Sequence, residues 1–188
     1  MIISRQVNTE KSIMRQKSIW TIGHSTRTLD EFIAMLNSFQ IELVADIRSY
    51  PGSRRYPHFN KETLAESLSA KNIEYRHLVG LGGRRKPRSD SHNTAWRVAA
   101  FKGYADYMET PDFKNAVTDL EFLGTDKRVA YMCSEAVWWS CHRSLVSDYL
   151  KFKGWTVMHI MAVGKAEEHP YTKPATIEGD KLTYTAKR

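Results

Sequence analysis

The sequence predicts an α/β protein: a single domain with an open, mostly parallel, Rossmann-like sheet of about five strands and helices on both faces. Short apolar or β-branched runs alternate with segments of helical periodicity along most of the chain. The runs at 41–47 and 129–133 are mostly apolar, which is typical of strands buried on both faces of a parallel sheet. A length of 188 residues with 41% hydrophobic residues suits one core.

We expect the chain to have three parts. Residues 1–17 are polar and without periodicity, and are predicted to form a flexible N-terminal arm. Residues 18–165 are predicted to form the α/β domain. Residues 166–188 contain Pro, Gly and mixed charge, which indicates a C-terminal tail or a small hairpin around 178–180.

The predicted strands and helices alternate in sequence. The strands are expected at 18–22, 41–47, 73–78, 129–133 and 155–160. The first helix begins with a capping box, in which Thr28 is the N-cap and Glu31 follows three residues later. Asn60 is predicted to cap a second helix that ends at about residue 71. Helical pieces are expected at 102–108, 111–123 and 143–153, the last closed by Gly154.

Composition excludes several classes of protein. No stretch approaches the roughly 20 apolar residues of a membrane span, and basic residues interrupt the N-terminus where a signal peptide has its apolar core. Two cysteines close together do not make a disulfide framework, so we expect a cytoplasmic location. A net charge of +7 favours a polyanionic partner, nucleic acid or a nucleotide, but it is equally compatible with solubility alone.

Unusual polar residues follow the ends of four predicted strands. In a parallel sheet these carboxyl ends meet at one edge, where open α/β sheets bind ligands. We therefore expect one crevice there, formed by His24, Ser25, Arg27, Asp46, Arg48, Ser53, Arg54, Arg55, Tyr56, His58, Gly82, Gly83, Arg84, Cys133, Glu135, Cys141, His142 and Arg143. Several arginines in one crevice favour recognition of phosphate or carboxylate through paired N–H donors.

The candidate residues fall into two groups. The predicted catalytic residues, which can transfer protons or act as nucleophiles, are Asp46, Cys133, Glu135, Cys141, His142 and His24. The predicted substrate- or phosphate-binding residues are Ser25, Arg27, Arg48, Arg54, Arg55, Gly82, Gly83, Arg84, Tyr104, Trp138, Trp139 and Arg143. Two adjacent tryptophans cannot both face the core from an extended loop, so one is expected to offer a stacking surface.

Some of these residues have a structural alternative. Asp46 is equally compatible with orienting a loop by accepting backbone N–H bonds. The Gly82–Gly83 pair is compatible with a plain turn or with close approach of backbone N–H groups to an anion.

The two cysteines are expected to differ. Cys141 lies at the predicted start of a helix beside His142 and Arg143, a setting that favours a reactive thiol. Cys133 ends a strand and is expected to be buried and inert. The cysteines lie eight positions apart, unlike the Cys-x-x-Cys spacing of zinc knuckles. A metal site that adds His142 and His24 to the cysteines is the minor alternative, and we expect no metal and no cofactor.

Six blocks in order resemble one family: TIGHSTRTLDEF, LVADIRSYPGSRRYPHF, LGGRRK, FKGYADYM, MCSEAVWWSCHR and VMHI. They resemble the family catalogued as domain of unknown function 488, from about residue 19 to 159. The family's characteristic polar residues fall on His24, Ser25, Arg27, Asp46, Arg48, Ser53, Pro57, Gly82, Gly83, Tyr104, Cys133, Glu135, Cys141, His142 and Arg143. The resemblance implies a soluble, mainly prokaryotic α/β protein and implies no activity.

The leading functional hypothesis is an enzyme that acts on nucleic acid or a nucleotide by base-directed or repair-type chemistry. In this hypothesis the arginines, with Lys86, hold phosphate and a tryptophan stacks on a base. One alternative is a cysteine-dependent enzyme for a small substrate, such as rhodanese-like sulfur transfer. Another is a non-catalytic sensor of a nucleotide or modified base.

Overall fold

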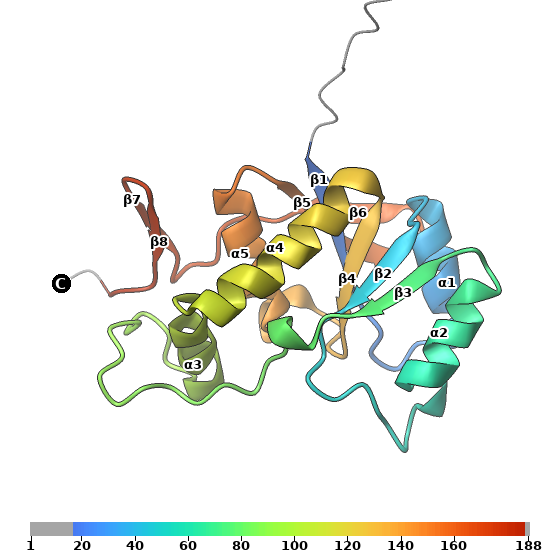
Figure 1. The fold of residues 1–188 in the computed structure, drawn as a ribbon, viewed down its shortest axis with the longest axis horizontal. Coiled ribbons are helices and arrows are strands. Elements are labelled where there is room, and N and C mark those ends of the chain that lie inside the picture. Colours follow the sequence, from blue (N-terminus) through green and yellow to red (C-terminus); the bar gives the residue numbers. More distant parts are fainter. Residues whose placement is uncertain (1–16, 187–188) are drawn as a thin grey trace, which may run out of the picture.

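A mostly parallel sheet between two layers of helices forms the protein, as the sequence predicts, with six strands instead of the expected five (Figure 1). The computed structural model describes residues 17–186. The strands are β1 (Ser18–Gly23), β2 (Leu43–Asp46), β3 (Glu74–His77), β4 (Val129–Cys133), β5 (Thr156–Ala162) and β6 (Lys165–Glu168). Their order in the sheet is β3-β2-β4-β1-β5-β6. Strands β1 to β5 are parallel, and β6 pairs antiparallel with β5.

Helices cover both faces of the sheet. They are α1 (Leu29–Ser38), α2 (Lys61–Ser69), α3 (Ala99–Met108), α4 (Pro111–Asp126) and α5 (Arg143–Phe152), with short 3-10 helices η1 (Pro57–Phe59), η2 (Val79–Leu81) and η3 (Trp138–Ser140). Buried side chains of α1 and α2, such as Phe32 and Leu64, form one core cluster. Those of α3, α4 and α5, such as Phe113 and Leu145, form the other cluster on the opposite face. No helix among residues 17–186 is long and apolar enough to cross a membrane.

The two predicted helix caps behave differently. At α1 the capping box is present: Glu31 N donates to Thr28 Oγ1 at 3.2 Å, and Thr28 N donates to Glu31 Oε2 at 2.8 Å. Asn60 is the N-cap of α2, but its side chain makes no capping bond. Its Oδ1 accepts instead from Ser53 N at 2.6 Å. Asn60 therefore fixes the loop after β2 rather than the helix end.

The C-terminal segment contributes more structure than the expected tail or hairpin. The hairpin around 178–180 is present as β7 (Thr176–Glu178) and β8 (Lys181–Thr183), turning at Gly179 with φ +62°. Strand β6 also falls largely in this segment and adds an antiparallel edge to the sheet. The predicted N-terminal arm, apart from Lys17, lies outside the described residues.

The strand order brings the loops of the predicted crevice together. Strand β4 lies between β2 and β1, and its register pairs Cys133 with Gly23 and Met132 with Asp46. The backbone continues these contacts past the strand ends, since His24 N donates to the Cys133 carbonyl at 3.0 Å. The residues that follow β1, β2 and β4 therefore surround one point at the carboxyl edge of the sheet.

Candidate functional site

A cleft of about 680 Å³ opens at this carboxyl edge. Ten of the sequence-predicted site residues line it: His24, Ser25, Arg48, Gly83, Arg84, Tyr104, Cys133, Glu135, Cys141 and His142. Eight others do not: Arg27, Asp46, Arg54, Arg55, Gly82, Trp138, Trp139 and Arg143. The cleft is also lined by Ser53 and Tyr56, which the sequence placed in the crevice, and by Ser49, Tyr50 and Phe101, which it did not single out. The position of Tyr50 in the Pro- and Arg-rich loop after β2 was the available signal for it.

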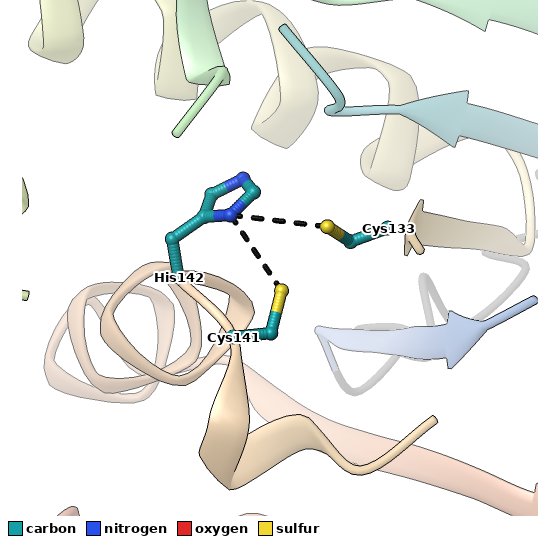
Figure 2. A group of neighbouring side chains, drawn as sticks. All are labelled: Cys133, Cys141 and His142. Carbon is teal, nitrogen blue, oxygen red and sulfur yellow. Dashed lines mark hydrogen bonds between the residues drawn. The ribbon is translucent and has the colours of Figure 1, made fainter. Parts of the chain in front are cut away.

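Cys133, Cys141 and His142 form a compact group in the cleft, here called the thiol–imidazole cluster (Figure 2). Cys133 ends β4, whereas Cys141 and His142 directly precede α5. His142 Nδ1 lies 3.9 Å from the Sγ of Cys133 and 3.5 Å from the Sγ of Cys141. His142 Nε2 lies 3.1 Å from the Ile47 carbonyl oxygen. Because a carbonyl only accepts, Nε2 carries a proton, and Nδ1 is the ring nitrogen that faces the two sulfurs.

The structure reverses the expected order of the two thiols. Both are buried. A hydrogen bond from Cys141 and then contact with His142 hold the pKa of Cys133 well below the usual value for a thiol, against the effect of burial. Burial raises the pKa of Cys141, and its hydrogen bond to Cys133 raises it further. The helix-start position of Cys141 does not make it the more acidic thiol, because burial and the hydrogen bond to Cys133 both favour its protonated form.

Asp46 performs the structural role that the sequence left open. It is fully buried, and Arg48 donates to it from N, Nε and the terminal nitrogen NH2 at 2.6–3.1 Å. The Tyr75 hydroxyl donates to Asp46 Oδ2 at 2.6 Å. NH2 of Arg48 also donates to the Phe59 carbonyl at 2.9 Å. Both carboxylate oxygens are therefore committed to orienting Arg48 and the loop that follows β2, which leaves none for proton transfer.

His24 lies on the cleft wall as a neutral ring. Its Nδ1 donates to the Ser25 carbonyl at 2.9 Å, and Arg48 NH1 approaches its Nε2 at 3.4 Å. The ring stacks on Phe59 with centroids 4.3 Å apart. Burial lowers the pKa of His24 to about 4. Both ring nitrogens already have partners, so His24 does not extend the thiol–imidazole cluster.

Arg143 and two glycines hold the loops around the cleft close together. Arg143 is 1% exposed, and it donates to Thr21 Oγ1 at 3.0 Å and to the Glu135 carbonyl at 2.7 Å. It is an anchor for the loop before α5 rather than a ligand for substrate. A Cβ at Gly23 would lie 1.7 Å from the Glu135 carbonyl oxygen, and one at Gly83 would lie 2.9 Å from His142 Nδ1. These glycines allow the loops to approach closely enough to form the site.

The remaining basic residues do not converge on the cleft as expected. Arg27 donates to the Gly23 carbonyl at 2.7 Å. Arg54 and Arg55 are exposed outside the cleft, on the loop that forms part of its wall. Arg84 stands at the rim, with its guanidinium 5.4 Å from the ring centroid of Tyr50. Two of the predicted arginines, Arg48 and Arg84, line the cleft, and only Arg84 is exposed, because Arg48 is paired with Asp46 and Arg143 is buried behind the site.

The tryptophans lie outside the cleft. Trp138 stacks on His159 with centroids 4.5 Å apart and an angle of 5°, and its indole N–H donates to Glu167. Trp139 is 53% exposed and packs edge-on against Trp138. One tryptophan is thus packed and the other open, as the sequence suggested, but the open one faces solvent away from the cleft lining.

Comparison with known proteins places the chain in a family. A family model described as Domain of unknown function DUF488 matches residues 28–150. The chain belongs to this family. The matched region of this DUF488 protein begins at the N-cap of α1 and ends within α5, so it contains the whole thiol–imidazole cluster. Searches of curated proteins and of solved structures found no match.

A chain of buried hydrogen bonds lies behind the cleft of this DUF488 protein. Thr21 Oγ1, which accepts from Arg143, bonds His159 Nδ1 at 3.0 Å, and His159 Nε2 bonds His169 Nδ1 at 2.8 Å. His169 Nε2 donates to Asp148 Oδ1 at 2.9 Å. His169 is thereby hydrogen-bonded to a buried carboxylate, and burial lowers the pKa of His159. The chain ties the C-terminal segment to the arginine that anchors the site.

Proposed function

We propose that the protein is an enzyme that acts on a nucleotide, free or within a single-stranded nucleic acid, by base-directed chemistry at the thiol–imidazole cluster. The observation that carries the proposal is the position of this cluster inside a cleft whose rim bears Arg84 beside Tyr50. Reactive groups lie deep and a phosphate-binding cation lies at the mouth. This is the arrangement that a nucleotide entering base-first requires.

The size and lining of the cleft support this substrate class. Its volume of about 680 Å³ lies within the usual range for small-ligand sites. Tyr50, Tyr56 and Phe101 offer aromatic surface on which a base can stack. Arg84 supplies a guanidinium for the phosphate, and Arg54 and Arg55 extend positive charge along the neighbouring loop for a longer strand.

The chemistry available in the cleft is acid–base or nucleophilic. His142 can accept a proton at Nδ1, and the cysteines can donate one or act as nucleophiles. Glu135 is an exposed carboxylate on the same cleft wall. We do not extend the proposal to rhodanese-like sulfur transfer. A 3-10 helix interrupts the segment between Cys133 and Arg143, so this segment does not form a short loop whose backbone N–H groups surround an anion.

The proposal predicts salt-sensitive binding of nucleotides and single strands. Binding affinity is measured by fluorescence anisotropy with labelled single-stranded and duplex DNA and RNA, and by calorimetry with free nucleotides. The single strands are expected to bind more tightly than duplexes, with an affinity that falls as salt rises from roughly 50 to 200 mM. Arg84→Ala should reduce the salt slope by about 1, as expected for loss of one phosphate contact.

The matched control is Lys71→Ala, which removes one exposed positive charge at the end of α2, just before β3 begins. It should leave binding unchanged. Absence of salt-sensitive binding by every nucleotide and strand, or equal effects of the two variants, would contradict the proposal. Incubation of the bound ligand followed by mass spectrometry separates an enzyme from a sensor, because a sensor returns the nucleotide unchanged.

A further inference from the structure

We propose that Cys133, Cys141 and His142 bind one zinc ion and leave its fourth coordination position open to the cleft. The site stands on the geometry of these three side chains. Its use on a nucleotide rests on the proposed function above. The inference replaces our expectation from the sequence that no metal is bound.

The ligand atoms already have the spacing that zinc requires. The two sulfurs and Nδ1 of His142 all lie within 4.8 Å of one another, with Nδ1–Sγ distances of 3.9 and 3.5 Å (Figure 2). In a tetrahedral site with Zn–S of about 2.3 Å and Zn–N of about 2.0 Å, sulfur and nitrogen ligands lie roughly 3.5 Å apart. Both Nδ1–Sγ distances therefore match a tetrahedral zinc site to within a few tenths of an ångström.

The tautomer of His142 is the one that a metal needs. Its Nε2–H donates to the Ile47 carbonyl, which fixes the ring and leaves the Nδ1 lone pair directed at the sulfurs. Metal-binding histidines almost always donate their second ring nitrogen to a carbonyl or carboxylate in this way. Tyr104 packs against the same ring with centroids 5.1 Å apart. The imidazole is thus oriented before any ion arrives.

Contacts with two different elements hold the sulfurs in place. Cys133 is fixed at the end of β4, and the backbone N–H of Arg143 approaches Cys141 Sγ at 3.5 Å. Two thiolates and one imidazole form a soft to borderline donor set, which selects zinc over the oxygen-seeking ions Mg²⁺ and Ca²⁺.

The number of ligands indicates a reactive site rather than a structural one. Structural zinc sites have four protein ligands, whereas catalytic sites have three and a water molecule. Within residues 17–186, this group contains only the three side chains, and the nearby His24 is already committed to Ser25 and Arg48. A water at the open position would lose its proton to solvent near neutral pH and supply hydroxide to the cleft.

Metal titration tests the site. The protein is purified under reducing conditions, stripped with a chelator and titrated with Zn²⁺ against a chromophoric competitor. Co²⁺ serves as a spectroscopic probe of tetrahedral thiolate coordination. We expect one zinc per chain, and at least about 100-fold weaker binding in Cys141→Ser and His142→Gln. His92→Gln removes an exposed histidine outside the cleft lining and should bind zinc like the wild type.

The outcomes separate the two proposals. Less than one zinc per chain at saturation, or unchanged affinity in both cluster variants, would overturn the metal site. If Cys141→Ser loses cooperative thermal unfolding, the partly exposed His142→Gln and the cobalt spectrum of the wild type decide the question. Zinc binding without nucleotide binding would overturn the proposed function and leave the metal site standing. Nucleotide binding without zinc binding would overturn the metal site and leave the proposed function standing.

Discussion

Replacement of Asp46 by asparagine should destabilise the protein strongly, because the carboxylate is the counter-ion of a buried guanidinium. Asp46 is fully buried and Arg48 is 6% exposed. Four hydrogen bonds from Arg48 and one from Tyr75 end on the two carboxylate oxygens. The asparagine side chain lacks the charge, and its NH2 group faces donors rather than acceptors. Arg48 is then left charged, buried and only partly hydrogen-bonded.

The magnitude follows from this loss of the counter-ion. Removing one partner of a buried ion pair costs about 3–5 kcal/mol of folding free energy. For a chain of this length, each kcal/mol lowers the Tm by roughly 2–4 °C. Asp46→Asn should therefore melt roughly 6–20 °C below the wild type. It should lose a large share of the roughly 5–15 kcal/mol that stabilises a typical domain.

Urea unfolding followed by circular dichroism measures the difference. The control is Glu74→Gln, which removes a surface ion pair with Lys127 from a 48% exposed residue and should cost less than about 1 kcal/mol. The double variant Asp46→Leu/Arg48→Met, which removes both charges, should recover part of the lost stability. Equal, small losses in Asp46→Asn and Glu74→Gln would refute the structural role that we assign to this carboxylate.

Three further changes test other contacts. Gly83→Ala places a Cβ 2.9 Å from His142 Nδ1 and should weaken zinc binding at least about 10-fold, measured in the same competition titration. Lowering the pH from 7 to 4 should reduce the free energy of unfolding by about 3 kcal/mol through His24. The pKa of His24 is about 4 in the folded protein and 6.5 in the unfolded chain, so the unfolded chain binds a proton that the folded protein does not. Urea unfolding across this range should show a shallower loss for His24→Asn, and an identical loss would contradict a buried neutral ring. Thr28→Ala removes the acceptor for Glu31 N and should cost about 1 kcal/mol in the same assay at pH 7.

Local sequence signals predicted helices and strands well where burial or a contact between near neighbours in the chain is enough to define the element. The runs that became β2 and β4 are mostly apolar because both faces of these strands are buried, so composition alone revealed them. The capping box at Thr28 involves groups three residues apart, which makes it readable without tertiary information. Strand β6 has the sequence KAEE and was missed, because an edge strand with exposed side chains carries no hydrophobic pattern.

The position of the cleft could be predicted from the sequence, but the contacts of its residues could not. Parallel strands place their carboxyl ends at one edge, so the sequence was sufficient to bring Cys133, His142 and His24 into one crevice. It was not sufficient to show that Arg48 faces Asp46, since an arginine after a strand serves phosphate or a carboxylate equally well.

The sequence by itself determined the fold class, the edge of the sheet that carries the cleft and most of the residues around it, because these follow from periodicity and topology. Only the tertiary structure decided which side chains are free to react. The proton on Nε2 of His142 is fixed by the Ile47 carbonyl, and the low pKa of Cys133 depends on a hydrogen bond from Cys141, which comes from a different part of the fold. Such contacts join residues far apart in the chain, and their distances are set by packing, which no local pattern encodes.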